Sequence, residues 1–320
     1  MVRHFLKDDD ITPAEQRTIL ELTEKLRAQP YYEQPLLGPK AVAFITDKPT
    51  LRTQASFAIG IAELGGYPFM VDGNLAQIGV RESIADTTRV LDRMVSAIVW
   101  RTYADERIQE MAAISKVPVI NALTDGYHPC QILADLSTIA QHTGGVRALP
   151  GKVLTYIGDG ANNMANSYLL GGATAGMHVQ IACPPEYEPS IEVVNRAADI
   201  AATTGGSVAV LHDPRQAVAG ADVVATDTWV SMGTESEKAQ REAIMAPYQL
   251  NSDLLAGSRQ DAIVLHCLPA YRGSEITAAV IDGPQSVVFD EAENRLHAQK
   301  ALLIWLLAQN SNRHPARSEA

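Results

Sequence analysis

Cysteine is scarce in this chain of 320 residues, which contains Cys130, Cys183 and Cys267 and no other cysteine. These three residues do not form the CxxC pairs typical of thiolate zinc sites, and their number and spacing do not suggest a disulfide framework. The sequence therefore predicts three free thiols and no metal centre held by cysteine.

Long apolar runs and clusters of basic residues are missing as well. No apolar run approaches the ~20 residues that a membrane-spanning helix requires, and the N-terminal segment carries acids where a signal peptide has its apolar core. The formal net charge is −11, with both signs interspersed along the chain. This pattern argues against a nucleic acid or a membrane as the main partner and predicts a cytoplasmic protein.

What the chain does contain is a repeated alternation of strand-like and helix-like segments. Hydrophobic residues make up 46% of the composition, so at this length two domains with separate cores are expected. Strands separated by amphipathic helices indicate βαβ units and parallel sheets, so the predicted fold class is α/β, with two doubly wound parallel-sheet domains joined by interdomain helices. The expected strands are 41–46, 67–71, 97–101, 117–122, 152–160, 178–184, 207–212, 221–227 and 261–269.

The domain limits follow from the same pattern. We expect a first domain over 1–144, completed by an apolar C-terminal helix at about 294–309, and a second domain over 151–290. The polar tail 310–320 is predicted to be disordered. In the first domain, Thr12 followed by Pro13 and Glu15 predicts the capped start of an amphipathic helix.

Ligands of open α/β sheets bind beyond the carboxyl ends of the strands, so residues directly after each strand are candidates for a site. After the first strand, Thr50 is expected to cap a helix that also presents Arg52 and Thr53. A cation, hydroxyls and the free N–H groups of a first helical turn suit a bound phosphate. A capping threonine beside an ordinary surface arginine is the simpler alternative.

Two further strand ends carry polar side chains in the first half of the chain. Arg101 ends one expected strand, and His128 and Gln131 open a helix three residues apart, so both can face one ligand. Taken alone, a structural arginine and a hydrogen-bonded core histidine explain the same residues.

The segment "GDGANNMANS" is a glycine-rich strand-to-helix turn and invites a dinucleotide-binding interpretation. It lacks the third glycine of GxGxxG, and the next strand ends without an acidic residue for a ribose, so a dehydrogenase is discounted. Asn163 in this turn is instead a neutral donor and acceptor suited to the carboxylate of an amino acid.

The segments "TDTWVSMGTE" and "HCLPA" follow two strands of the second half. Asp227 is suited to an ammonium group, Ser231 and Gly233 suggest a mobile polar loop, and Leu268-Pro269 is a candidate cis bond. Cys267 admits two interpretations, a buried inert thiol or a protease nucleophile with His128 as its base.

Taken in order, these segments resemble ornithine carbamoyltransferases along nearly the whole chain. The resemblance rests on "HPCQILADL", "GDGANNMANS", "DTWVSMG", "HCLPAYRG" and "DEAENRLHAQKALL". It implies a first domain for carbamoyl phosphate, a second for L-ornithine, and a homotrimer with shared active sites. The implied activity is transfer of the carbamoyl group to the δ-amine of ornithine, giving citrulline and phosphate, in arginine biosynthesis, with no metal and no organic cofactor.

The resemblance also implies roles for individual residues. The catalytic set would be Arg52, Arg101, His128, Cys267 and Arg295. Carbamoyl phosphate would contact Thr50, Leu51, Arg52, Thr53, Arg101, His128 and Gln131, with Gln77 and Arg81 supplied by a neighbouring subunit. Ornithine would contact Asn163, Asp227, Ser231, Met232, Cys267 and Leu268.

The phosphate loop departs from the family pattern Ser-Thr-Arg-Thr-Arg, because this chain reads Thr50-Leu51-Arg52-Thr53-Gln54. Leu51 replaces a hydroxyl donor and Gln54 replaces a cation. Losing one hydrogen bond to a charged group costs ~1.5–3 kcal/mol, or roughly 10- to 150-fold. We therefore keep a second hypothesis, a non-catalytic or inhibitor-insensitive paralogue, beside that of an active enzyme.

Overall fold

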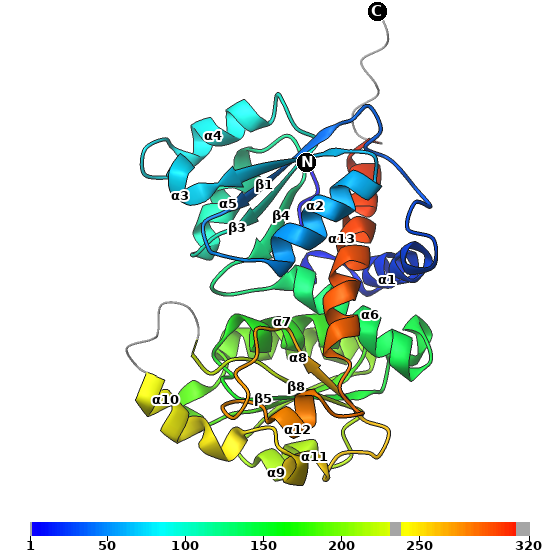
Figure 1. Cartoon of the computed structure of the whole chain (residues 1–320), viewed down its shortest axis with the longest axis vertical. Helices are drawn as coiled ribbons and strands as arrows, with labels where there is room; N and C mark the ends of the chain where they lie inside the picture. The colour runs from blue at the N-terminus through cyan, green and yellow to red at the C-terminus, as the bar shows by residue number, and fades with distance from the viewer. Residues whose placement is uncertain (1, 231–237, 312–320) are drawn as a thin grey trace, which may run out of the picture. The chain divides into compact units, whose positions relative to one another are not determined.

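A computed structural model of the chain describes residues 2–230 and 238–311. They form two compact units (Figure 1). Unit 1 contains the described residues of Met1–Ile11, Thr18–Ala134 and Glu293–Ala320, and unit 2 contains those of Thr12–Arg17 and Asp135–Ala292. The chain thus changes unit inside a helix, at Ala134 and Asp135, while the predicted limits around 144–151 stay a prediction.

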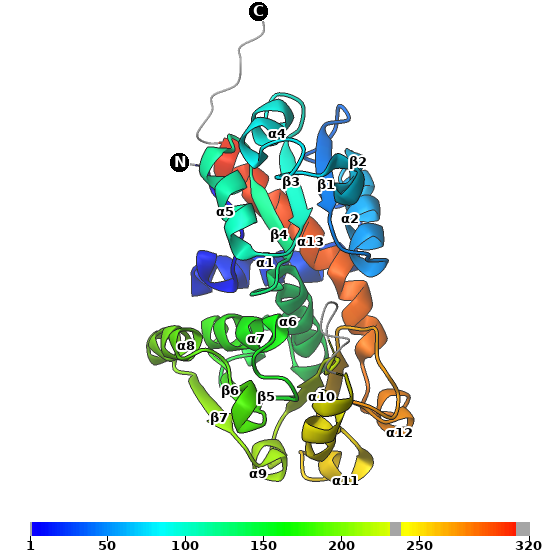
Figure 2. The ribbon, with the colours of Figure 1, turned by 90° about the vertical axis from the view of Figure 1, so that its left-hand side faces the viewer.

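Unit 1 is built on a sheet of four parallel strands in the order β2-β1-β3-β4. Alternation along β1 points Phe44 to one face, where its ring centroid lies 5.7 Å from that of Phe57 on α2. Ala43 and Ile45 face the opposite side and pack with α4 and α5 (Figure 2). The strands are β1 (Ala41–Thr46), β2 (Tyr67–Asp72), β3 (Ala97–Arg101) and β4 (Val119–Leu123).

The helices of unit 1 follow the expected alternation of strand and helix. Gly60 of α2 lies against the C-terminal helix, because a Cβ at this position would stand 3.1 Å from Cγ of Lys300. The helices with residues in this unit are α1 (Pro13–Ala28), α2 (Arg52–Glu63), α3 (Gly73–Ala76), α4 (Ile84–Leu91), α5 (Asp105–Ile114), α6 (Pro129–Thr143) and α13 (Val288–Ser311), of which α1, α6 and α13 also contribute residues to unit 2.

Unit 2 contains a sheet of five parallel strands in the order β7-β6-β5-β8-β9. One face of this sheet forms an apolar core with α9, α11 and α12, and α7 and α8 cover the other face (Figures 1 and 2). Its elements are β5 (Val153–Ile157), α7 (Asn163–Thr174), β6 (His178–Ala182), α8 (Ile191–Thr204), β7 (Ser207–Leu211), α9 (Pro214–Val218), β8 (Val223–Thr226), α10 (Lys238–Met245), α11 (Ser252–Leu255), β9 (Ile263–His266) and α12 (Ala278–Ile281).

The predicted fold class is confirmed in its main point, since both units are α/β layers on parallel sheets. The capped start of α1 is also confirmed, because the Thr12 N–H donates to Glu15 at 2.8 Å and the Glu15 N–H donates to Thr12 Oγ1 at 3.3 Å. No helix in the described part of the chain is long and apolar enough to cross a membrane.

Two expectations about helix ends were wrong. Thr50 does not cap α2, because Leu51 takes the N-cap position with right-handed helical backbone angles and makes no side-chain capping hydrogen bond. At the other end of the chain, α13 extends through Asn310 and Ser311, where Asn310 Oδ1 accepts a hydrogen bond from the Arg3 N–H at 2.9 Å. The rest of the predicted tail, 312–320, lies outside the described residues.

Candidate active site

Both sheets reverse their strand order at one point, and polar residues follow the strands on either side of it. In unit 1 the reversal lies between β1 and β3, and in unit 2 it lies between β5 and β8. Diverging crossovers leave a crevice at such a point, where ligands of open α/β sheets bind. The topology therefore places the residues after β1 and β3, and those after β5 and β8, at the two candidate sites.

In unit 1 the structure brings four of the predicted residues into one hydrogen-bonded group. Arg295 on α13 donates from Nη2 to Thr53 Oγ1 at 3.0 Å and from Nη1 to Gln131 Oε1 at 2.5 Å. Arg101, at the end of β3, donates from Nη1 to the same threonine oxygen at 3.5 Å. Two guanidinium groups thus converge on Thr53, in the first turn of α2.

His128 experiences the positive electrostatic potential of the neighbouring arginine side chains. It is buried, and its pKa is lowered well below 6.5 by that burial and by the positive charges of Arg295, Arg101 and Arg52. A histidine in this environment stays neutral at physiological pH and can donate one N–H. The group therefore has a strong positive charge and a neutral imidazole, which suits a bound anion.

Lys48 adds a fourth cation that the sequence interpretation missed. Its buried ammonium group lies 2.5 Å from Asp125 and 4.8 Å from the ring centroid of Tyr103, and it contributes to the lowered pKa of His128. The sequence feature that could have identified Lys48 is its position two residues after the end of β1. It lines a cavity of about 470 Å³ together with Thr46, Pro49, Gln54, Met70, Val71 and Asp72.

Four other predicted residues of unit 1 take no part in the hydrogen bonds around Thr53. Leu51 is 77% exposed, and Thr50 is half-buried directly before it. Gln77 and Arg81 are exposed and lie in the segment between α3 and α4, where Gln77 has a backbone φ of +50°. Within the described residues, no hydrogen bond joins Gln77 to the arginines around Thr53.

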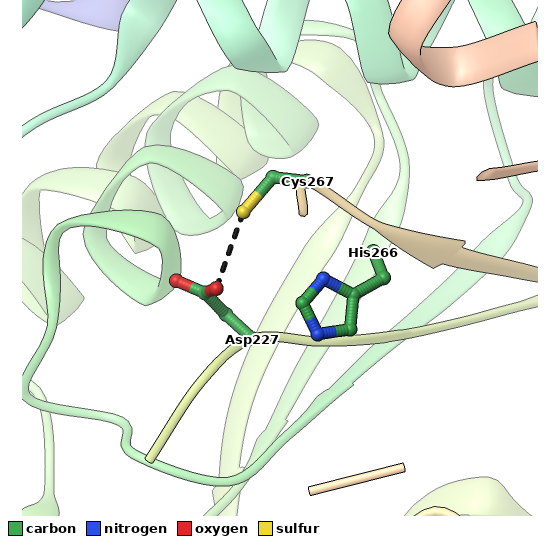
Figure 3. A group of neighbouring side chains, drawn as sticks. All are labelled: Asp227, His266 and Cys267. Atoms are coloured by element: carbon green, nitrogen blue, oxygen red, sulfur yellow. Dashed lines mark hydrogen bonds between the residues drawn. The ribbon is translucent and has the colours of Figure 1, made fainter. Parts of the chain in front are cut away.

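In unit 2 the ends of β8 and β9 bring Asp227 and Cys267 together (Figure 3). The Cys267 thiol donates to Asp227 Oδ1 at 3.2 Å, and the same oxygen accepts from the Thr228 N–H at 2.7 Å. Burial raises the pKa of Asp227, while His266 and these hydrogen bonds act to lower it. Among the residues that the structure describes, no lysine or arginine pairs with Asp227, and a buried carboxylate in this state suits a cationic ligand.

His266 and Glu275 hold the turn that carries Cys267. The Leu268 N–H donates to His266 Nδ1 at 2.9 Å, so Nε2 carries the proton and donates to Glu275 Oε1 at 3.0 Å. The same glutamate oxygen accepts from the Tyr271 N–H at 2.6 Å. Leu268 has a φ of +57°, a conformation that costs a leucine ~1–2 kcal/mol, and this network maintains it. The Leu268-Pro269 bond is cis, as expected.

Asp227, His266 and Cys267 are also residue types that hold metal ions, and their ligand atoms lie within 4.8 Å of one another. Both ring nitrogens of His266 are engaged, however, one by the Leu268 N–H and one by Glu275. Metal ligation would displace one of these partners and require loss of the thiol proton. The arrangement is that of a hydrogen-bonded group.

The pKa of the Cys267 thiol argues against the protease interpretation. Burial and the neighbouring carboxylates of Asp227 and Glu291 raise this pKa well above its ordinary value of 9.0. The thiolate is the nucleophilic form, and it is disfavoured here. Cys267 therefore acts as a hydrogen-bond donor to Asp227.

This thiol should react slowly with alkylating reagents. At pH 8 we expect iodoacetamide to modify Cys267 in the folded protein at least ~10-fold more slowly than in the urea-unfolded chain, because the thiolate is rarer. The rate should rise with pH beyond the range in which an ordinary thiol is fully ionised. Peptide-resolved mass spectrometry provides the measurement, and equal rates in folded and unfolded protein would contradict the assignment.

Asn163 begins α7, after the glycine-rich turn that follows β5. The preceding residue, Asn162, is the cap, since its Oδ1 accepts from the Ala165 N–H at 2.9 Å and its Nδ2 donates to the Tyr156 hydroxyl at 2.8 Å. Ser231, Met232 and Gly233 lie outside the described residues. A cavity of about 170 Å³ in this unit is lined by Thr228, Trp229, Val230, Lys238, Glu242, Tyr271, Ser274 and Glu275.

Comparisons with known proteins match nearly the whole length of the chain. The family model described as "Aspartate/ornithine carbamoyltransferase, carbamoyl-P binding domain" matches residues 3–141, and the model of its "Asp/Orn binding domain" matches residues 150–306. An ornithine carbamoyltransferase of Clavibacter sepedonicus is 60% identical over 310 residues, which are 97% of this chain and 100% of that protein.

Solved structures agree with the sequence comparison. The ornithine carbamoyltransferase from Pyrococcus furiosus superposes with a TM-score of 0.91 at 44% identity, covering 96% of this chain and 97% of that one. The anabolic ornithine carbamoyltransferase from Campylobacter jejuni also has a TM-score of 0.91, at 36% identity, over 96% of this chain and 100% of that one.

Proposed function

Because the chain belongs to the aspartate/ornithine carbamoyltransferase family, we propose that it transfers the carbamoyl group of carbamoyl phosphate to the δ-amine of L-ornithine, giving L-citrulline and phosphate. The observation that carries this proposal is the presence of a cationic group in unit 1 and of a buried carboxylate in unit 2. Unit 1 gathers cations around Thr53 for a phosphorylated substrate, and unit 2 presents Asp227 for an amino-acid ammonium group.

Unit 1 is assigned the chemistry of the carbamoyl phosphate end. Arg52 and Thr53 hold the phosphate, with help from Thr50 and the backbone N–H of Leu51 in the first turn of α2. Arg101 and neutral His128 donate to the carbamoyl oxygen, on which negative charge develops when the amine attacks. Arg295 donates to both Gln131 and Thr53, and we assign to it and to Gln131 the role of keeping these groups in position.

Unit 2 is assigned the chemistry of the amino acid. Asp227 takes the α-ammonium group, while Asn163 takes the α-carboxylate together with Ser231 and Met232. Cys267 and Leu268 line the path of the δ-amine. Ornithine is favoured over aspartate because the chain carries the Ser-Met-Gly and His-Cys-Leu-Pro segments that resemble those of ornithine carbamoyltransferases, and the similar proteins are named as such.

The reaction needs no covalent enzyme intermediate and no cofactor. The neutral δ-amine attacks the carbamoyl carbon, the bond between that carbon and the phosphate oxygen breaks, and the proton lost by the amine passes to the departing phosphate. Holding two reactants in line supplies effective molarities of ~10⁵ M or more, so alignment and the fixed cations carry the catalysis.

A homotrimer with shared active sites completes the proposal. β2 is an edge strand, and its residues Tyr67, Phe69 and Met70 are exposed, as are Leu75 and Val80 just beyond it. An apolar open edge of this kind is a surface that proteins usually cover. We assign it to contacts between subunits that bring Gln77 and Arg81 to the site of a neighbour.

The physiological direction is proposed to be synthesis, in arginine formation. The support is the similarity to a Campylobacter jejuni protein that is described as anabolic. A cytoplasmic location stays a prediction from the sequence.

Steady-state citrulline formation on purified protein, with each substrate varied independently, tests the proposed function. We expect turnover with a KM for carbamoyl phosphate above that of enzymes with the Ser-Thr-Arg-Thr-Arg loop, since Leu51 removes a hydroxyl donor and Gln54 removes a cation from the phosphate loop. Absence of turnover at saturating substrates, with ornithine still bound by calorimetry, would instead support the non-catalytic paralogue.

A further inference from the structure

The buried carboxylate of Asp47 is shared by three segments of unit 1. Its Oδ2 accepts from Thr102 Oγ1 at 2.6 Å, from Trp100 Nε1 at 3.1 Å and from Arg107 Nη2 at 3.4 Å. Its backbone N–H donates to the carbonyl of Arg101 at 2.9 Å. Asp47 directly follows β1, so it ties the start of the phosphate loop to the end of β3.

Arg107 on α5 extends this network to a segment that carries Gln77. Its Nη2 also donates to the carbonyl oxygen of Ile78 at 2.8 Å, and its Nε donates to Thr102 Oγ1 at 2.9 Å. The guanidinium group lies over the Trp100 ring, 5.1 Å from its centroid. One planar side chain thus joins Asp47 to the backbone of the segment between α3 and α4.

The contact with Ile78 falls next to a strained residue. Gln77 has a φ of +50°, a conformation that costs a non-glycine residue ~1–2 kcal/mol, which contacts of the surrounding residues must offset. At the start of α3, directly before this segment, Gly73 lies against Asp47, because a Cβ there would stand 1.8 Å from Asp47 Oδ1. Asp47 therefore contacts the chain at the start of α3, and Arg107 links it to the following segment at Ile78.

We propose that Arg107 is a positioning residue that fixes the conformation of Gln77 and, through Asp47, sets the Gln77 segment in register with the phosphate loop. The inference rests on the proposed function, in which Gln77 serves the carbamoyl phosphate site of a neighbouring subunit. Arg107 does not touch the reacting atoms and acts through the Ile78 carbonyl.

Kinetics of Arg107→Met test this role in the full-length enzyme. We expect the KM for carbamoyl phosphate to rise ~10-fold, the typical loss for a hydrogen bond from a charged group, with the KM for ornithine within about 2-fold. Arg107→Lys keeps the charge beside Asp47 but lacks the fork that reaches Thr102 and Ile78 together, so it should rescue part of the effect. The matched control is Arg89→Met on the exposed face of α4, which should leave both constants unchanged.

A double-mutant cycle with Gln77→Ala separates positioning from a general structural role. If Arg107 acts through Gln77, adding Arg107→Met to Gln77→Ala should change kcat/KM for carbamoyl phosphate by less than about 2-fold. If the losses in kcat/KM of the two single variants instead multiply in the double variant, the inference is overturned. It is also overturned if Arg107→Met lowers only the thermal midpoint, leaves KM unchanged, and Arg107→Lys restores that midpoint. An inactive parent protein would overturn the proposed function and this inference with it. An active parent whose KM for carbamoyl phosphate is not changed by Arg107→Met would overturn this inference alone.

Discussion

Replacing Arg101 by methionine is expected to lower kcat for citrulline formation by ~10²–10³-fold, the usual cost of removing a donor to a developing oxyanion. Arg101 is buried at the end of β3 and contacts Thr53, where the phosphate loop begins its helix. It also helps to keep the pKa of His128 low. In the proposed mechanism, the substitution removes a positive charge beside the carbamoyl oxygen, on which negative charge develops in the transition state.

The same substitution should not cost stability. Arg52, Arg101 and Arg295 all act to lower the pKa of His128, so their like charges lie near one group, and removing one of them relieves part of their mutual repulsion. We expect the thermal midpoint of Arg101→Met, measured in a buffer free of phosphate and sulfate, to equal or exceed that of the parent. A kcat within 10-fold of the parent would contradict the assigned role, and Arg101→Lys should fall between the two.

Replacing Asp227 by asparagine is expected to raise the KM for ornithine by ~10- to 150-fold, because a buried charged hydrogen bond to the α-ammonium group is lost. The KM for carbamoyl phosphate should stay within about 2-fold. The amide is isosteric, so its oxygen can still accept from the Thr228 N–H and the Cys267 thiol. Initial-rate kinetics with ornithine varied at saturating carbamoyl phosphate provide the measurement.

A pH series of unfolding experiments supplies the control for Asp227→Asn. Because burial raises the pKa of Asp227 in the folded state, the ionised carboxylate destabilises the fold at every pH above that pKa. The variant should therefore be at least as stable as the parent near neutral pH, and this difference should vanish as the pH falls below the unfolded value of about 3.9. An unchanged KM for ornithine would remove Asp227 from the substrate site.

The alternation of apolar and polar segments was sufficient to predict the parallel sheets, because each buried strand is a short local run. The motif order was likewise sufficient for the family, which the comparisons confirm. The ends of helices were harder to predict from the sequence. Thr50 was a reasonable cap by residue type, yet the helical backbone conformation already includes Leu51, and a local pattern of residue preferences does not encode that difference.

Residues of the site that depend on distant partners were missed for a related reason. Lys48 looks like a surface lysine until Asp125, 77 positions away, is brought beside it. The role of His266 depends on which ring nitrogen carries the proton, and the Leu268 N–H and Glu275 decide that only in the folded turn. Asp47 and Arg107 were passed over because their connection to Gln77 runs through a backbone carbonyl, which leaves no mark on the sequence.

The cations gathered around Thr53 have a practical consequence for the choice of buffer. Phosphate is a product of the proposed reaction, and sulfate has a similar shape and charge, so either anion in a storage buffer would occupy the site as a ligand. A ligand present at 100 times its dissociation constant stabilises a fold by ~2.7 kcal/mol. Preparations kept in these salts would therefore gain shelf life and lose apparent activity together, and melting temperatures from different buffers would not be comparable.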